Sequence, residues 1–123
     1  MTALMLSERT TDRLRDIIED ARRIETFIDG MTLDDFLASE KTLFAVERLL
    51  QRITEAAIQI DPSDAAVLGR DLPIDKMRGL GNRLRHEYRD LDRAVVFEIA
   101  RIDVPALAVA ADMAIESGLT DGD

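Results

Sequence analysis

The sequence predicts an all-α fold, a four- to five-helix up-and-down bundle. Apolar residues recur at steps of three and four, which is the period of one helix face. The alternation of β-branched residues typical of strands is absent, and Ala, Leu, Ile, Arg and Glu dominate. Gly30 and Pro62 each follow an apolar-periodic stretch, where a helix is expected to stop. Helices therefore account for almost the whole chain.

Each expected helix has its own sequence signals. Thr10 or Thr11 caps the first helix, and Gly30 follows its end. Thr32 caps the second helix, and Asp34 lies in its first turn. Two prolines and a glycine mark residues 61–73 as a connection with one helical turn. The expected bounds, in chain order, are about 10–30, 32–61, 73–88, 92–102 and 105–118.

The chain of 123 residues suits one domain, 1–123, with frayed ends at about 1–6 and 118–123. It has no cysteine, which excludes disulfides, thiolate zinc sites and cysteine nucleophiles. With a single histidine, His86, we expect no metal site and no cofactor. No apolar run approaches the roughly 20 residues of a membrane span, and no signal peptide opens the chain. A cytoplasmic protein without a membrane partner is expected.

The formal charge of −9 is unevenly distributed. Residues 76–101 carry seven basic and four acidic side chains, a net charge of +3, which leaves −12 for the rest. An acidic protein is a poor general nucleic-acid binder, but a local basic patch is suited to holding a phosphate. The second and fifth helices are apolar on several faces, which predicts a homodimer.

The third helix has an unusual sequence over residues 77–88. An apolar stripe at helical spacing points inward, formed by Met77, Leu80, Leu84 and Tyr88. Gly79 and Gly81 interrupt the helix, at a cost of about 0.5–1 kcal/mol each. Two interpretations explain them: a close helix–helix crossing, or a bend or space for a ligand.

The opposite face of this helix brings together Gly79, Asn82, Arg83 and His86. A histidine transfers protons near neutral pH, a guanidinium clamps an anion, and an amide orients a substrate. That set suits cleavage of a phosphodiester. The alternative is a plain surface or interface histidine. Glu47 and Glu55 of the second helix either line the same cleft or pair along the helix with Arg48 or Arg52.

Asn82-Arg83-Leu84-Arg85-His86-Glu87-Tyr88 resembles the Arg-Asn-x-x-x-His-x-Tyr signature of the HepT-like proteins of the HEPN superfamily. The resemblance includes residues 45–48 and 53–57 upstream and residues 91–92, 95–99 and 104–107 downstream, and so covers most of the chain from about 10 to 116. It implies a HEPN-like bundle and a metal-independent endoribonuclease that acts as a toxin. It also implies a homodimer with both motifs in one cleft, and a minimal nucleotidyltransferase antitoxin as partner.

The resemblance assigns roles by position. His86 is the general acid or base in attack of a ribose 2′-hydroxyl on the RNA phosphodiester, with a 2′,3′-cyclic phosphate as product. Asn82 is its polar neighbour, and Tyr88 matches the tyrosine that the antitoxin modifies with AMP (AMPylation).

The family's arginine is replaced here by Gly81. Arg83 is our preferred substitute because it shares the face of His86, with Arg78 and Arg85 as supporting basic residues. The alternative is a catalytically degenerate HEPN module that binds a nucleotidyltransferase partner or a nucleotide without cleaving RNA. A third reading is a helical interaction domain with no ligand.

Overall fold

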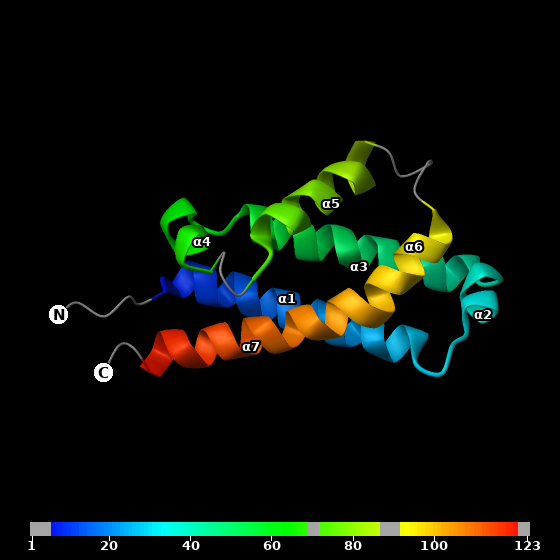
Figure 1. Ribbon diagram of the computed structural model, residues 1–123, viewed down its shortest axis with the longest axis horizontal. Helices are drawn as coiled ribbons and strands as arrows, with labels where there is room; N and C mark the ends of the chain where they lie inside the picture. The colour runs from blue at the N-terminus through cyan, green and yellow to red at the C-terminus, as the bar shows by residue number, and fades with distance from the viewer. Residues whose placement is uncertain (1–5, 69–71, 87–91, 121–123) are drawn as a thin grey trace.

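Four long helical segments form the bundle in the computed structural model (Figure 1). The structure describes residues 6–68, 72–86 and 92–120, with the backbone alone at 85, 86 and 118–120. The described part contains helices and no strand, which confirms the all-α prediction. The long segments are α1 (Glu8–Ile28), α3 (Glu40–Ile58), α5 (Ile74–His86) and the continuous run of α6 (Arg93–Glu98), η1 (Ile99–Asp103) and α7 (Val104–Thr120). The short helices are α2 (Leu33–Leu37) and α4 (Pro62–Leu68).

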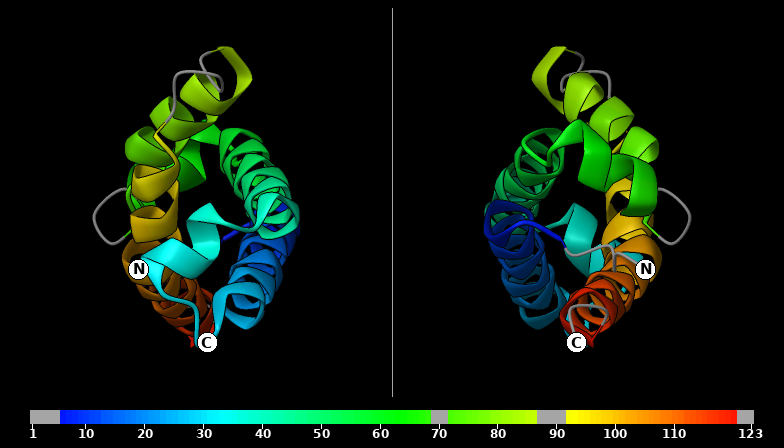
Figure 2. Two further views of the ribbon diagram at one scale, coloured as in Figure 1. Left: turned by 90° about the vertical axis from the view of Figure 1, so that its right-hand side faces the viewer. Right: turned by 90° about the vertical axis from the view of Figure 1, so that its left-hand side faces the viewer.

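The helix α1 lies at the centre of the packing. It contacts both α3 and α7, whereas α5 packs mainly on α3. Figures 1 and 2 show α5 on one side of the bundle and the pair α1 and α7 on the other. Leu14, Ile17 and Ile24 of α1 are completely buried, as their spacing on one helix face predicts. No helix in the described ranges is both long and apolar enough to cross a bilayer.

The first helix begins earlier than predicted. Ser7 is the cap, and its hydroxyl accepts the backbone N–H of Thr10 at 3.1 Å. The predicted caps at Thr10 and Thr11 are therefore wrong, because the preceding serine already satisfies the free N–H group. Thr10 is instead buried and donates its hydroxyl to Asp64 of α4 at 2.5 Å. Gly30 does follow the end of α1, with φ of +74°, a conformation that favours glycine.

The predicted second helix is divided in two. Thr32 caps α2 as expected, in a capping box with Asp35. The chain then leaves the helix at Ser39, whose hydroxyl accepts the N–H of Thr42 and starts α3. The prediction of one continuous helix over 32–61 is wrong because this serine offers the backbone an alternative partner.

The predicted gap between the fourth and fifth helices is also wrong. The chain passes from α6 to α7 through the π turn η1, where the N–H of Val104 donates to the carbonyl of Ile99. Pro105 has no N–H to donate, so the ordinary bond to the residue four positions before it is missing. One extra residue in the turn thus replaces a loop. The helix α7 continues to Thr120, two residues beyond the predicted end, and the expected extension of α5 to Tyr88 lies outside the described residues.

Candidate functional site

The helix α5 is anchored by its apolar stripe. Ile74, Met77 and Leu84 are 4%, 6% and 1% exposed, and α5 packs on α3. Leu80 is half-buried at the edge of this contact. The predicted inward stripe is therefore confirmed at Met77 and Leu84. Because this stripe packs on α3, the opposite side of α5 is turned away from α3.

The outer face of α5 carries three of the predicted site residues. Asn82 and Arg83 are exposed, and Arg78 is half-buried. The Nε atom of Arg78 is buried and has no hydrogen-bond partner in the structure. His86 is the last residue of α5, one turn after Asn82 and Arg83. The side chains of Arg85 and His86, and all of Tyr88, lie outside the described residues.

A groove of about 590 Å³ lies between α5, α3 and the η1–α7 segment. Its α5 wall includes Lys76 and Arg83, and Asp103 of η1 also lines it. Its lining is otherwise mostly apolar, with Leu50, Ile53, Met77, Leu80, Ile99, Val104 and Leu107 among the residues. The groove thus combines an apolar floor with two cations along the helix that carries the motif.

Gly79 also lines this groove, on the exposed side of α5. A Cβ atom built at Gly79 would have no neighbour within 4 Å. The close helix–helix crossing considered for the glycines is therefore wrong at this position. Gly79 instead leaves open space beside the backbone of α5, on the side that faces the groove.

Sequence comparison identifies the family. The family model "Ribonuclease HepT-like" matches residues 17–113. This chain belongs to the HepT-like ribonuclease family.

Individual HepT-like relatives agree with this assignment. A probable ribonuclease HepT of Thermococcus cleftensis is 36% identical over 96 residues, which cover 78% of this chain and 86% of the relative. Two proteins of Methanocaldococcus jannaschii, whose names give RNase as a provisional assignment, are 30% and 34% identical. These matches cover 76% and 75% of this chain, and 77% and 75% of the respective relatives. No solved structure matches the chain significantly.

The departure from the HepT-like signature occurs at a buried point of α5. Gly81 is buried, whereas Asn82 and Arg83 after it are exposed. Arg83 lies on the wall of the groove, but neither Arg78 nor Asn82 is among the groove-lining residues. The structure therefore brings Arg83, and not Arg78, to the groove of this HepT-like protein.

Neither Glu47 nor Glu55 of α3 is among the residues that line this groove. Glu47 is half-buried, and burial raises its pKa while the positive charge of Arg93 on α6 acts in the opposite direction. Glu55 shares a depression between α1 and α3 with Arg48 and Arg52.

Sequence reasoning missed the buried carboxylate of Asp20. Asp20 is 2% exposed on α1, where its Oδ1 accepts a hydrogen bond from Arg23 at 2.6 Å and its Oδ2 forms an ion pair with Nε of Arg52 at 2.9 Å. Its place between Ile17 and Ile24 on the apolar stripe was the available signal. The ion pair with Arg52 makes Asp20 a link between α1 and α3.

Proposed function

We propose that this HepT-like protein is a metal-independent endoribonuclease and the toxin of a toxin–antitoxin pair. The observation that carries the proposal is the family match over residues 17–113 with Asn82, Arg83 and His86 within the last turns of α5. The local charge of +3 over residues 76–101 supports contact with an RNA phosphate in an otherwise acidic protein. A cytoplasmic location follows from this proposed substrate.

His86 performs the proton transfer in the proposed reaction. As general base it takes the proton of a ribose 2′-hydroxyl, whose oxygen attacks the adjacent phosphorus. The bond from phosphorus to the 5′-oxygen breaks, and that oxygen leaves with a proton from a general acid. The products are a 2′,3′-cyclic phosphate and a 5′-hydroxyl. Every atom of the cyclic product comes from the RNA itself.

Arg83 stabilises the negative charge of the pentavalent transition state, with Arg78 or Arg85 in support. Asn82 is one turn before His86 on the same face and orients the phosphate or the imidazole by hydrogen bonding. Removing one donor of this kind from a transition state typically slows a reaction by about a hundred- to a thousandfold.

The active form in this proposal is a homodimer. The groove beside α5 offers an apolar area to a second copy, with Leu80 and Leu107 half-buried. Two α5 faces then share one cleft, so that one His86 serves as base and the other as acid. A minimal nucleotidyltransferase antitoxin transfers AMP to Tyr88, and the added charge and bulk block RNA.

The test is cleavage of bulk RNA by the purified protein in excess EDTA, with His86→Ala and His86→Asn as matched variants. Both variants are expected to lose cleavage while size-exclusion chromatography shows an unchanged oligomer. Equal cleavage by wild type and variants would contradict the role of His86. Enzyme concentrations must be high enough to detect activity that is about a thousandfold weakened.

The replacement of the family arginine by Gly81 favours a second candidate, a degenerate module that binds the nucleotidyltransferase or a nucleotide without cleaving RNA. Coexpression with a neighbouring nucleotidyltransferase, followed by mass spectrometry, separates the candidates when combined with the cleavage assay. An AMP adduct that Tyr88→Phe abolishes, together with no RNA cleavage, would assign the degenerate module. Neither adduct nor cleavage would leave a helical interaction domain.

A further inference from the structure

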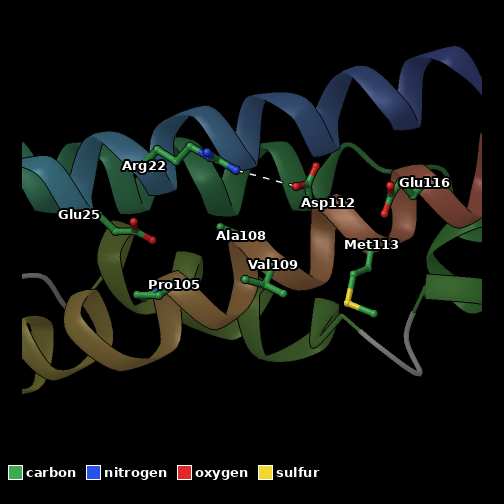
Figure 3. A pocket seen from close by; sticks show the side chains of 8 residues that line it. All are labelled: Arg22, Glu25, Pro105, Ala108, Val109, Asp112, Met113 and Glu116. Atoms are coloured by element: carbon green, nitrogen blue, oxygen red, sulfur yellow. Dashed lines mark ion pairs between the residues drawn. The ribbon is translucent and has the colours of Figure 1, made fainter.

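The face of the bundle formed by α1 and α7 has exposed apolar side chains (Figure 3). Val109 is 60% exposed and Met113 is 63% exposed, although α7 buries other apolar residues in the core. Val109 and Met113 are four residues apart, so they lie next to each other and form a short apolar stripe along this side of the helix.

The stripe borders a shallow depression between the two helices. The depression has a volume of about 300 Å³, and Pro105 and Ala108 also line it. Large exposed apolar side chains that gather beside a depression with a charged rim are typical of a protein-binding surface. An α-helix packs its own apolar side chains against such a stripe at the same spacing.

The rim of this depression is acidic. Glu25 of α1 and Asp112 and Glu116 of α7 line it, and among the residues that the structure describes Arg22 is the only basic one in the lining. The pair Arg22–Asp112 is exposed, with 3.8 Å between its charged atoms. The rim therefore carries a net charge of −2 at neutral pH.

We propose that the α1–α7 face binds a partner protein through a basic amphipathic helix. Apolar side chains of that helix cover Val109 and Met113, and its Lys or Arg residues face Glu25, Asp112 and Glu116. A second copy of this chain fits the face poorly, because a symmetric contact places the two acidic rims against each other. RNA and anionic membranes are repelled by the same charges.

The place of this face gives the contact a function beyond the proposed RNA cleavage. The α1–α7 face lies on the side of the bundle away from α5 (Figures 1 and 2). A partner bound there leaves the outer face of α5 uncovered. The contact therefore recruits a partner without competing with a ligand on α5.

The test uses the full-length protein and a fluorescein-labelled helical peptide with Leu at heptad positions a and d and Lys at e and g. Fluorescence anisotropy is expected to show binding that weakens with added salt. The double variant Val109→Ser/Met113→Ser removes the apolar side chains without adding charge, and it should lower the affinity about tenfold or more. The variant Glu25→Lys/Glu116→Lys should bind the Lys peptide more weakly. It should bind the same peptide with Glu in place of Lys more tightly than wild type does.

Phe44→Ser is the matched control, because Phe44 is a comparably exposed apolar residue on α3, 58% exposed and outside this face. It should leave peptide binding unchanged, and circular dichroism should show the same helicity for all variants. Absence of binding, equal binding of the Glu peptide, or equal effects of Phe44→Ser and the double variant would overturn the proposal. A change from dimer to monomer in Val109→Ser/Met113→Ser would assign the face to a second copy instead, which also overturns it.

Discussion

Removal of the Asp20 carboxylate tests how the bundle is held together beneath the proposed site. Asp20 is 2% exposed; its Oδ1 accepts a hydrogen bond from Arg23 at 2.6 Å, and its Oδ2 forms an ion pair with Arg52 at 2.9 Å. The ion pair with Arg52 joins α1 to α3, the helix on which α5 packs. Because α5 packs on α3, loss of the link between α1 and α3 is expected to disturb the position of α5 and of the proposed site.

The magnitude follows from the burial of each partner. A hydrogen bond to a charged group contributes about 1.5–3 kcal/mol. The two arginine side chains are 44% and 51% exposed, so water replaces part of what they lose. We therefore expect Asp20→Ala to lower the free energy of unfolding by about 2–3 kcal/mol, and Arg52→Ala by about 1–2 kcal/mol because Arg23 remains.

Urea unfolding followed by circular dichroism at 222 nm, at one fixed protein concentration, measures these differences. The control is Asp112→Ala, which removes an exposed pair with 3.8 Å between its charged atoms and should cost less than about 0.5 kcal/mol. A loss for Asp20→Ala as small as that of Asp112→Ala would refute the reasoning. It would show that the buried carboxylate does not link the helices energetically.

Three further predictions concern other parts of the molecule. Burial raises the pKa of Glu47 above its ordinary value of 4.5, so its ionisation opposes folding; Glu47→Gln should stabilise the protein at pH 7, and urea unfolding should show that gain disappear as the pH falls below the ordinary value. A gain that persists unchanged at pH 3.5 would point to packing instead. Thr10→Val removes the hydroxyl that donates to Asp64 at 2.5 Å and should cost about 1–2 kcal/mol in the same assay; a cost near zero would mean that Ser7 alone holds Asp64. Arg83→Ala should slow RNA cleavage by about a hundred- to a thousandfold, and Arg78→Ala by less, since Arg83 lies on the groove wall and one turn from His86; the reverse order, measured on the same RNA, would make Arg78 the substitute for the family arginine.

Features of the fold that depend on residues close together in the sequence were predictable from the sequence. The cap at Thr32 and the stop at Gly30 follow from side-chain hydrogen bonding and backbone conformation within one turn. The break at Ser39 was missed because the apolar period continues across it, and the π turn was missed because Pro105 appeared to start a new helix. At Ser39 and at Val104, the backbone forms a hydrogen bond that local sequence patterns do not specify and that depends on how the helices pack.

The site shows the same division. Helical spacing predicted that Asn82 and Arg83 lie together on the outer face of α5, and both are exposed there. The same spacing predicts His86 on that face. The groove beside them was not predictable, because its other walls come from α3 and the η1–α7 segment. The partners of Asp20 likewise come from two different helices, and only the unusual position of an aspartate on an apolar stripe pointed to them.

The chemistry of the RNA ends tests the central claim most directly. A defined oligoribonucleotide is incubated with wild-type protein or His86→Ala in excess EDTA, beside the same sequence with every ribose 2′-O-methylated. We expect wild type to produce 2′,3′-cyclic phosphate and 5′-hydroxyl ends on the unmodified RNA only, and His86→Ala to produce none. Products with 3′-hydroxyl and 5′-phosphate ends, cleavage of the methylated strand, or the same products from His86→Ala would contradict attack by the ribose 2′-hydroxyl with His86 as the proton-transfer group.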